Sequence, residues 1–166
     1  LARRDFTANA IAWGRPAQGT AGAAGVAGGA AEDGGAAANA GAGAGTGHFE
    51  LVDPFGGRVD IEARVLRAVG DAGQRFREDA LRMVRGVRLA AALDFTIEAD
   101  TLAAMRSHAS LVGHLSGERI GAELEKLLTA PRPSVGLRLM QETGLLAVIS
   151  PELAAQPGVP QNKVPG

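Results

Sequence analysis

The sequence predicts an α+β fold that is mostly helical, with short strands in its first half and helices after them. Between residues 48 and 70, short apolar stretches flank a paired-glycine turn, a pattern typical of strands. From Arg75 onward, apolar residues recur at the spacing of helix faces. A Gly/Ala segment interrupts the first half and inflates the apolar composition without supplying core residues.

Two segments precede the first predicted strand. Residues 1–13 are charged and then apolar, which fits either an alternating strand or a short helix. In residues 14–47, 25 of 34 residues are Gly or Ala. Such a segment loses much backbone entropy and buries little area, so it is expected to be a disordered insert. Its Gly-Ala-Gly run lacks the Lys-Ser/Thr of a phosphate loop.

Residues 48–70 predict a small hairpin-like element. Residues 48–53 are interpreted as a strand and Pro54 to Gly57 as a turn, because paired glycines permit positive φ. The apolar residues of 59–61 and 65–69 then indicate an extended or mixed segment that ends at Gly70.

Helices are predicted over the remainder. The first runs from Arg75 to about Leu93, and the later ones share capping or stop signals at their ends: residues 100–109, 116–129, 134–143 and a turn at 145–149. Ser116 and Ser134 are the expected N-caps, and Gly144 is the expected stop. The tail carries three prolines after Gln156, so residues 154–166 are expected to be a linker.

Composition excludes several classes of protein. No run of 18 strongly apolar residues exists, so no membrane partner is expected. Cysteine is absent, which excludes disulfides and thiolate chemistry and suits a cytoplasmic location. The net charge is -1, so no global basic field indicates nucleic acid. The chain opens on Leu1 without a signal peptide, and it is expected to be a fragment.

Residues 75–88 form the densest charged cluster, with five arginines against Glu78 and Asp79. Three of the arginines follow at steps of three residues: Arg82, Arg85 and Arg88. An acidic acceptor beside arginine donors on one rigid helix could bind the edge of a base, and the other arginines could hold phosphates. A solvated helix face with ion pairs explains the same spacing, and charge spacing alone favours that second interpretation.

Two further clusters are candidates. Arg3, Arg4 and Asp5, followed by Asn9, could contact a triphosphate and a ribose hydroxyl, or could form the polar edge of a segment. Asp53 to Gly57 with Asp60 fits a plain tight turn equally well. The histidines have no metal-ligand spacing and are expected to be ordinary surface or core residues: His48, His108 and His114.

Four segments in this order carry a family resemblance: RRDFTANAIA, DPFGGRVDIEARVLRAVG, RFREDALRMVRGVRLAAALDF and SGERIGAELEKLL. Together they resemble the class II tRNA nucleotidyltransferases and bacterial poly(A) polymerases, and most closely the CCA-adding enzymes. The resemblance covers about residues 3–13 and 48–153. It implies the C-terminal part of a nucleotidyltransferase head in residues 1–73, a helical neck in residues 74–153 and the linker beyond.

The resemblance implies roles residue by residue. The first segment matches the motif that contacts ribose and triphosphate, and the third matches an amino-acid template whose Asp and Arg hydrogen-bond the Watson–Crick edge of CTP or ATP. The implied nucleotide-binding residues are Arg3, Arg4, Asp5, Asp79, Arg82, Arg85 and Arg88. The implied supporting residues are Asn9, Asp53, Gly56, Gly57, Asp60, Glu78, Glu118 and Arg119. The implied reaction adds CMP or AMP to the 3′ end of tRNA or another RNA and releases pyrophosphate.

The chain also departs from the family. Members carry an upstream Asp-x-Asp pair that holds two Mg²⁺ ions, and no Asp-x-Asp occurs in these 166 residues. Magnesium is therefore expected in the parent enzyme, with no catalytic or metal-binding residue in this chain. Two other hypotheses remain: a non-catalytic nucleotide- or RNA-binding helical module, and a helical interaction domain with surface ion pairs.

Overall fold

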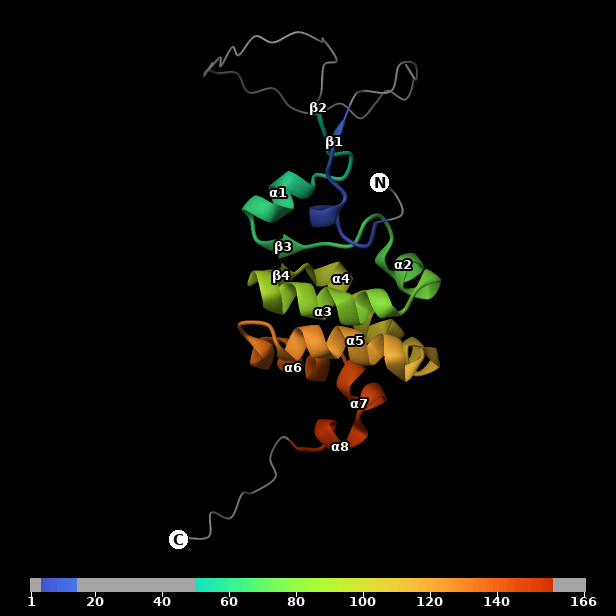
Figure 1. The fold of residues 1–166 in the computed structure, drawn as a ribbon. Coiled ribbons are helices and arrows are strands. Elements are labelled where there is room, and N and C mark those ends of the chain that lie inside the picture. Colours follow the sequence, from blue (N-terminus) through green and yellow to red (C-terminus); the bar gives the residue numbers. More distant parts are fainter. Residues whose placement is uncertain (1–3, 15–49, 157–166) are drawn as a thin grey trace. The chain divides into compact units, whose positions relative to one another are not determined.

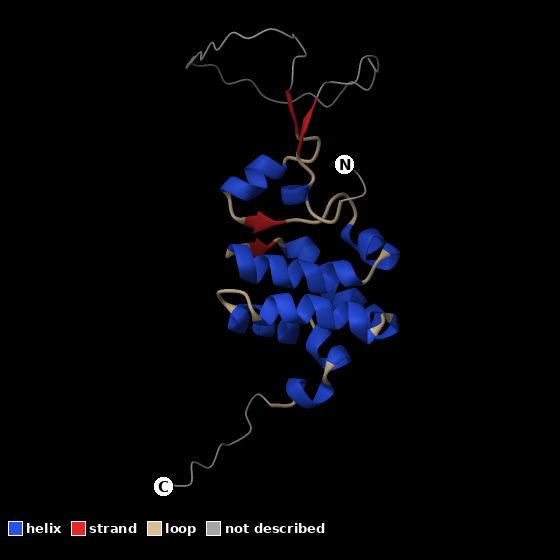
Figure 2. Cartoon of the chain, in the orientation of Figure 1, coloured by secondary structure: helices blue, strands red, loops and turns tan. Residues whose placement is uncertain are grey.

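The computed structural model describes residues 4–14 and 50–156. Helices dominate and the strands are few and short, which confirms the predicted class (Figure 2). The predictions for Arg3, His48, nearly all of the Gly/Ala segment and most of the tail lie outside the described residues. The elements, η marking 3₁₀ helices, are η1 (Thr7–Asn9), β1 (Ala12–Gly14), β2 (Glu50–Val52), α1 (Gly57–Glu62), β3 (Val65–Leu66), α2 (Ala72–Glu78), α3 (Leu81–Leu93), β4 (Thr96–Ile97), α4 (Ala99–His108), η2 (Ala109–His114), α5 (Gly117–Leu128), α6 (Pro133–Glu142), α7 (Leu145–Ile149) and α8 (Pro151–Ala154).

The described residues fall into two compact units. The smaller one contains residues 13–14 and 50–52, and strands β1 and β2 pair there. The larger one contains residues 4–12 and 53–156, and every candidate site residue that the structure describes belongs to it. The division into a head, a neck and a linker stays a prediction.

In the larger unit, residues 5–7 of the N-terminal segment form backbone hydrogen bonds with residues 67–69, which follow β3. Phe6 pairs with Ala68 in an antiparallel bridge, and Val69 N–H donates to the carbonyl of Asp5 at 3.2 Å. Strand β3 in turn pairs in parallel with β4, with Leu66 opposite Ile97. Phe6 is fully buried, so this pairing fixes the position of the neighbouring Asp5.

Helix α1 replaces the extended segment predicted for residues 59–61. Asp53 accepts the N–H groups of Gly57 and Arg58 at 2.7 and 2.9 Å, which satisfies the first amides of the helix. Gly56 has φ +71, a left-handed conformation that favours glycine. The alternating apolar residues suggested a strand, but Val59 is 68% exposed, so that pattern does not reflect burial.

The single helix predicted from Arg75 to Leu93 is wrong, because the chain breaks at Asp79. Asp79 is extended, with φ -153 and ψ 104. Its N–H closes α2 by donating to the carbonyl of Arg75, and its side chain accepts Leu81 N–H at the start of α3. An Asp side chain that bonds nearby amides competes with the helix in this way.

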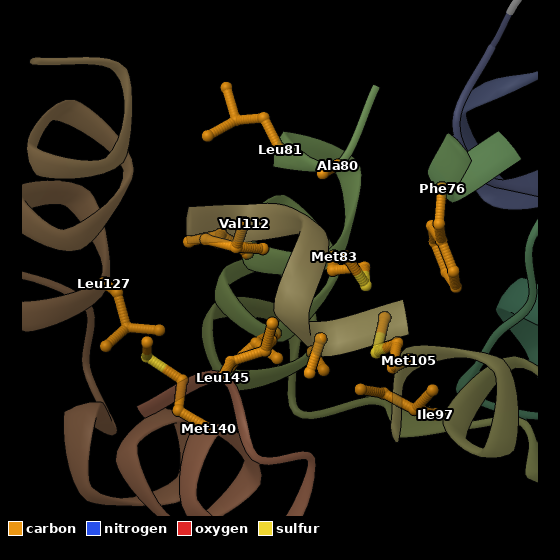
Figure 3. Packing of buried hydrophobic residues seen from close by; sticks show 14 of the residues in the cluster. Phe76, Ala80, Leu81, Met83, Ile97, Met105, Val112, Leu127, Met140 and Leu145 are labelled. Atoms are coloured by element: carbon orange, nitrogen blue, oxygen red, sulfur yellow. The ribbon is translucent and has the colours of Figure 1, made fainter. Parts of the chain in front are cut away.

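Helix α3 is the centre of the core. It lies between the β3–β4 pair and helices α5 and α6 (Figure 1). Figure 3 shows core side chains from α3, η2, α5, α6 and α7: Met83, Val112, Leu127, Met140 and Leu145. All five side chains are fully buried, and each such burial stabilises the fold by about 1.5–3 kcal/mol.

The later helices match their predicted ranges closely. Ser116 occupies the N-cap position of α5, although its side chain makes no capping bond. Ser134 is not a cap, because α6 begins at Pro133, whose missing N–H costs nothing at the first helical position. Gly144 follows the C-cap of α6 with a left-handed φ of +79, so it terminates this helix as predicted. In the described ranges, no helix has the length and apolarity needed to cross a membrane.

Gly57→Ala is expected to lower the free energy of unfolding by about 1–3 kcal/mol, because overpacking forces atoms apart. A Cβ at Gly57 would lie 2.2 Å from the carbonyl oxygen of Thr7, a backbone atom that cannot rotate away. Urea denaturation measures the change. Gly121→Ala in α5 is the matched control, since its Cβ would enter open space. Equal stability of Gly57→Ala and the wild type would contradict the close approach.

Candidate nucleotide-binding site

Asp5 joins the N-terminal segment to helix α3. Its carboxylate accepts Arg82 Nε at 2.9 Å and also bonds Arg85 Nη1. The Asp5 side chain is 11% exposed and that of Arg82 is 13% exposed, so water screens this pair little. Burial disfavours the charge of Arg85, but the hydrogen bond and charge of Asp5 outweigh it and raise the pKa of the guanidinium. The predicted ribose motif and the predicted template therefore meet at Asp5.

Glu78 and Arg82 face each other across the break between α2 and α3. Arg82 Nη1 donates to Glu78 Oε2 at 3.0 Å, and Arg75 bonds the other oxygen of Glu78 at 3.0 Å. Arg82 Nη1 also reaches the carbonyl of Arg75 at 3.3 Å. Arg82 is thus held from α2 as well as by Asp5.

Asp79 is held by α5 instead. Arg119 Nη2 donates to both carboxylate oxygens, at 3.1 and 2.9 Å. The neighbouring Glu118 lies exposed in the first turn of α5. The prediction that Asp79 and Arg82 lie on one rigid helix is wrong, because Asp79 forms the break after α2 and Arg82 lies in the first turn of α3.

Glu123 is a buried acid that sequence reasoning missed. It is 6% exposed and accepts Arg88 Nε at 2.7 Å, with Arg85 Nε at 3.7 Å. The helical spacing could have indicated its burial, because Glu123 lies three residues after Ile120 and four before Leu127, on the apolar face of α5. A carboxylate at such a position needs a buried partner, and the α3 arginines supply it.

Five of the candidate residues line one polar hollow of about 290 Å³, together with Leu89: Arg4, Asp5, Asn9, Arg85 and Arg88. Arg4 is exposed at its edge. Asn9 accepts Phe6 N–H at 3.2 Å and closes the turn of η1. Guanidinium groups around a small hollow suit phosphate, because their N–H donors match its oxygens.

The remaining candidates support α1. Besides Asp53 and the glycines, Asp60 is 6% exposed and accepts Thr7 Oγ1 at 2.6 Å. Arg67 Nε donates to both Asp60 oxygens at 3.3 and 3.2 Å. These bonds tie α1 to η1 and to Arg67, which directly follows β3, so Asp60 positions the segment that carries Asp5.

The stability contributed by Asp53 is expected to disappear in acid. The hydrogen bond from Arg58 N–H outweighs desolvation and lowers the pKa of Asp53 below its usual 3.8. A lowered pKa in the folded state stabilises the fold above the unfolded pKa, and this contribution is lost as the pH falls through the lowered value. Wild type should therefore melt above Asp53→Asn at pH 7, and the gap should close below pH 3.8. Melting temperatures across pH measure it, and a gap that grows in acid would contradict the cap.

The described part of the chain contains no cluster of side chains that could bind a metal ion. Within residues 4–14 and 50–156, no three His, Asp or Glu side chains lie close enough together to hold one. The acids of the candidate site instead bind arginines: Asp5, Glu78, Asp79 and Glu123.

Parts of this chain are similar to proteins of known family. A family model described as "Probable RNA and SrmB- binding site of polymerase A" matches residues 94–156. A CCA-adding enzyme of Geobacillus thermodenitrificans is 49% identical over 98 residues, which are 59% of this chain and 24% of that protein. A CCA-adding enzyme of Geobacillus stearothermophilus is 48% identical over 64% of this chain and 26% of its own length.

A solved structure shows the fold as well. The crystal structure of the Bacillus stearothermophilus CCA-adding enzyme in complex with CTP has a TM-score of 0.67 and 40% identity, covering 93% of this chain and 31% of that chain. The chain thus spans about a quarter of the length of the curated relatives it matches. Over the region that these relatives match, the chain is similar to CCA-adding enzymes, and residues 94–156 match the polymerase A model.

Proposed function

We infer that this chain selects the nucleotide and binds RNA within a template-independent RNA nucleotidyltransferase. The whole protein would add CMP and AMP from CTP and ATP to the 3′ end of tRNA and release pyrophosphate. The observation that carries this inference is the meeting of Asp5, Arg82 and Arg85 beside Asp79. The relatives named as CCA-adding enzymes support it.

Asp79 and Arg82 offer the groups that distinguish C and A from U and G. Cytosine and adenine carry an exocyclic amine donor, where uracil and guanine carry a carbonyl acceptor. A carboxylate accepts from that amine, and a guanidinium donates to the ring nitrogen beside it. Within the described part of the chain, the contacts of Arg82 use Nε and Nη1, which leaves Nη2 as a donor. The protein would therefore choose the base.

The α3 arginines would hold the triphosphate. Arg85 and Arg88 line the polar hollow with Arg4, and their positions are fixed by Asp5 and Glu123. Arg3 precedes this group in the sequence. Phosphate oxygens would replace part of these acidic contacts. Magnesium belongs to this proposal only as an expected cofactor of the whole protein, since the described residues offer it no site.

Incorporation of labelled nucleotides tests the function. The protein that contains this chain, at the length of its relatives, is incubated with tRNA that lacks its terminal CCA. Addition of two C and one A is expected, and no incorporation of either nucleotide would contradict the proposal.

Poly(A) synthesis is the second candidate, because the matching family model is described for polymerase A. The same assay separates the two. A poly(A) polymerase would extend RNA with long A tails from ATP alone, whereas a CCA-adding enzyme would stop after one A.

A further inference from the structure

A second hollow, of about 470 Å³, lies between α2, η2 and the start of α5. Its apolar lining includes Phe76, which is buried, and Leu111 and Leu115, which are half-buried. Its volume falls within the roughly 300–1,000 Å³ of pockets that take small organic molecules. None of the functional roles argued above uses Leu111, Leu115 or His114.

The rim of this hollow carries two arginines, Arg77 and Arg119, and two acids, Glu78 and Asp79. Its two acids are already paired, Glu78 with Arg75 and Arg82, and Asp79 with Arg119. Arg77, by contrast, lies 4.0 Å from Asp71, and both side chains are mostly exposed. Arg77 Nη1 also meets His108 Nε2 at 3.0 Å, an uncharged acceptor when His108 Nδ1 donates to the carbonyl of Ala104. His114 adds an exposed ring to the rim.

An apolar lining beside the exposed Arg77 and His114 suits one nucleotide of a single strand. Apolar side chains take the face of a base, and arginine and histidine donors take a phosphate. A peptide or lipid would use the apolar surface without needing this rim. Leu111, His114, Leu115 and Arg119 also lie within the 94–156 match to a model described as a probable RNA-binding site.

We propose that this hollow binds one nucleotide of the RNA strand that is extended. The proposal rests on the proposed function and gives it a separate RNA subsite. Asp79 borders the hollow while its carboxylate lies beside α3, so the bound RNA nucleotide lies next to the residue that reads the incoming base.

Binding measurements with two exposed substitutions test the subsite. Arg77→Gln and His114→Gln are made singly in the protein at the length of its relatives, and labelled tRNA lacking CCA is titrated by fluorescence anisotropy. Each substitution is expected to weaken tRNA binding about tenfold, since contacts to a stacked nucleotide and its phosphate are lost. Arg77→Gln should also reduce the slope of log affinity against log salt by about one. The affinity for CTP should stay within about twofold.

Arg138→Gln is the matched control, an exposed arginine of α6 that does not line the hollow. Arg77 also contacts His108, so Arg77→Gln could weaken tRNA binding by destabilising the fold. If Arg77→Gln lowers the melting temperature, the tRNA affinity of His114→Gln is the result that tests the subsite. Unchanged tRNA affinity in His114→Gln would overturn the proposal, and so would an equal loss of CTP affinity. If the wild type itself incorporated no nucleotide into tRNA, the proposed function would fail instead.

Discussion

Asp5→Ala is expected to lower the free energy of unfolding by about 2–3 kcal/mol. The substitution leaves Arg82 and Arg85 without their shared carboxylate, and Arg82 is only 13% exposed. Breaking a buried pair by removing one partner costs about 3–5 kcal/mol, and the one-third exposure of Arg85 reduces this. Chemical denaturation of the 166-residue chain measures the change.

Glu142→Ala is the matched control for Asp5→Ala. Glu142 pairs with Arg106, but both side chains are about half exposed, at 48% and 50%. An exposed pair contributes about 0–1 kcal/mol, so this variant should remain close to wild type. Equal losses in the two variants would show that Asp5 does not hold the N-terminal segment on α3.

Removal of Asp79, one of the two residues proposed to read the base, is expected to disturb the choice of base. One good pair of hydrogen bonds discriminates against a wrong base by about 1–3 kcal/mol. Asp79→Ala should therefore reduce selectivity for CTP over UTP by roughly 5- to 150-fold, with a smaller effect on tRNA binding. Steady-state incorporation of each nucleotide measures the ratio.

Arg82 requires a gentler substitution, because it also bonds Asp5 and Glu78. Arg82→Lys keeps the charge near both acids but removes the planar fork that a base edge needs. We expect selectivity to fall in this variant while the melting temperature changes little. Arg138→Ala, on the exposed side of α6, should change neither property.

The helices α4, α5, α6 and α7 were predictable because their apolar spacing and stop signals lie within the sequence. Gly144 ends α6 where expected, and its φ of +79 explains why glycine stands there. The break at Asp79 was not predicted, since apolar spacing continues through it. The structure shows the break in the extended backbone of Asp79 and in the hydrogen bond from Leu81 N–H to its side chain.

The contacts that build the site come from residues far apart in the sequence. Spacing placed Arg82, Arg85 and Arg88 on one side of a helix, but no local pattern pairs Asp5 with Arg85, which lies 80 residues away. Strand β4 was also missed, because Thr96–Ile97 is too short to show alternation and forms by pairing with β3. Such long-range pairs depend on tertiary packing.

Competition among the four nucleotides tests whether Asp79 and Arg82 choose the base. The wild-type protein and the variants Asp79→Ala and Arg82→Lys each receive tRNA lacking CCA and labelled CTP, ATP, UTP or GTP. If the two residues read the base, wild type accepts C and A and rejects U and G, whereas both variants also incorporate U or G. Wild-type selectivity retained in both variants would contradict it.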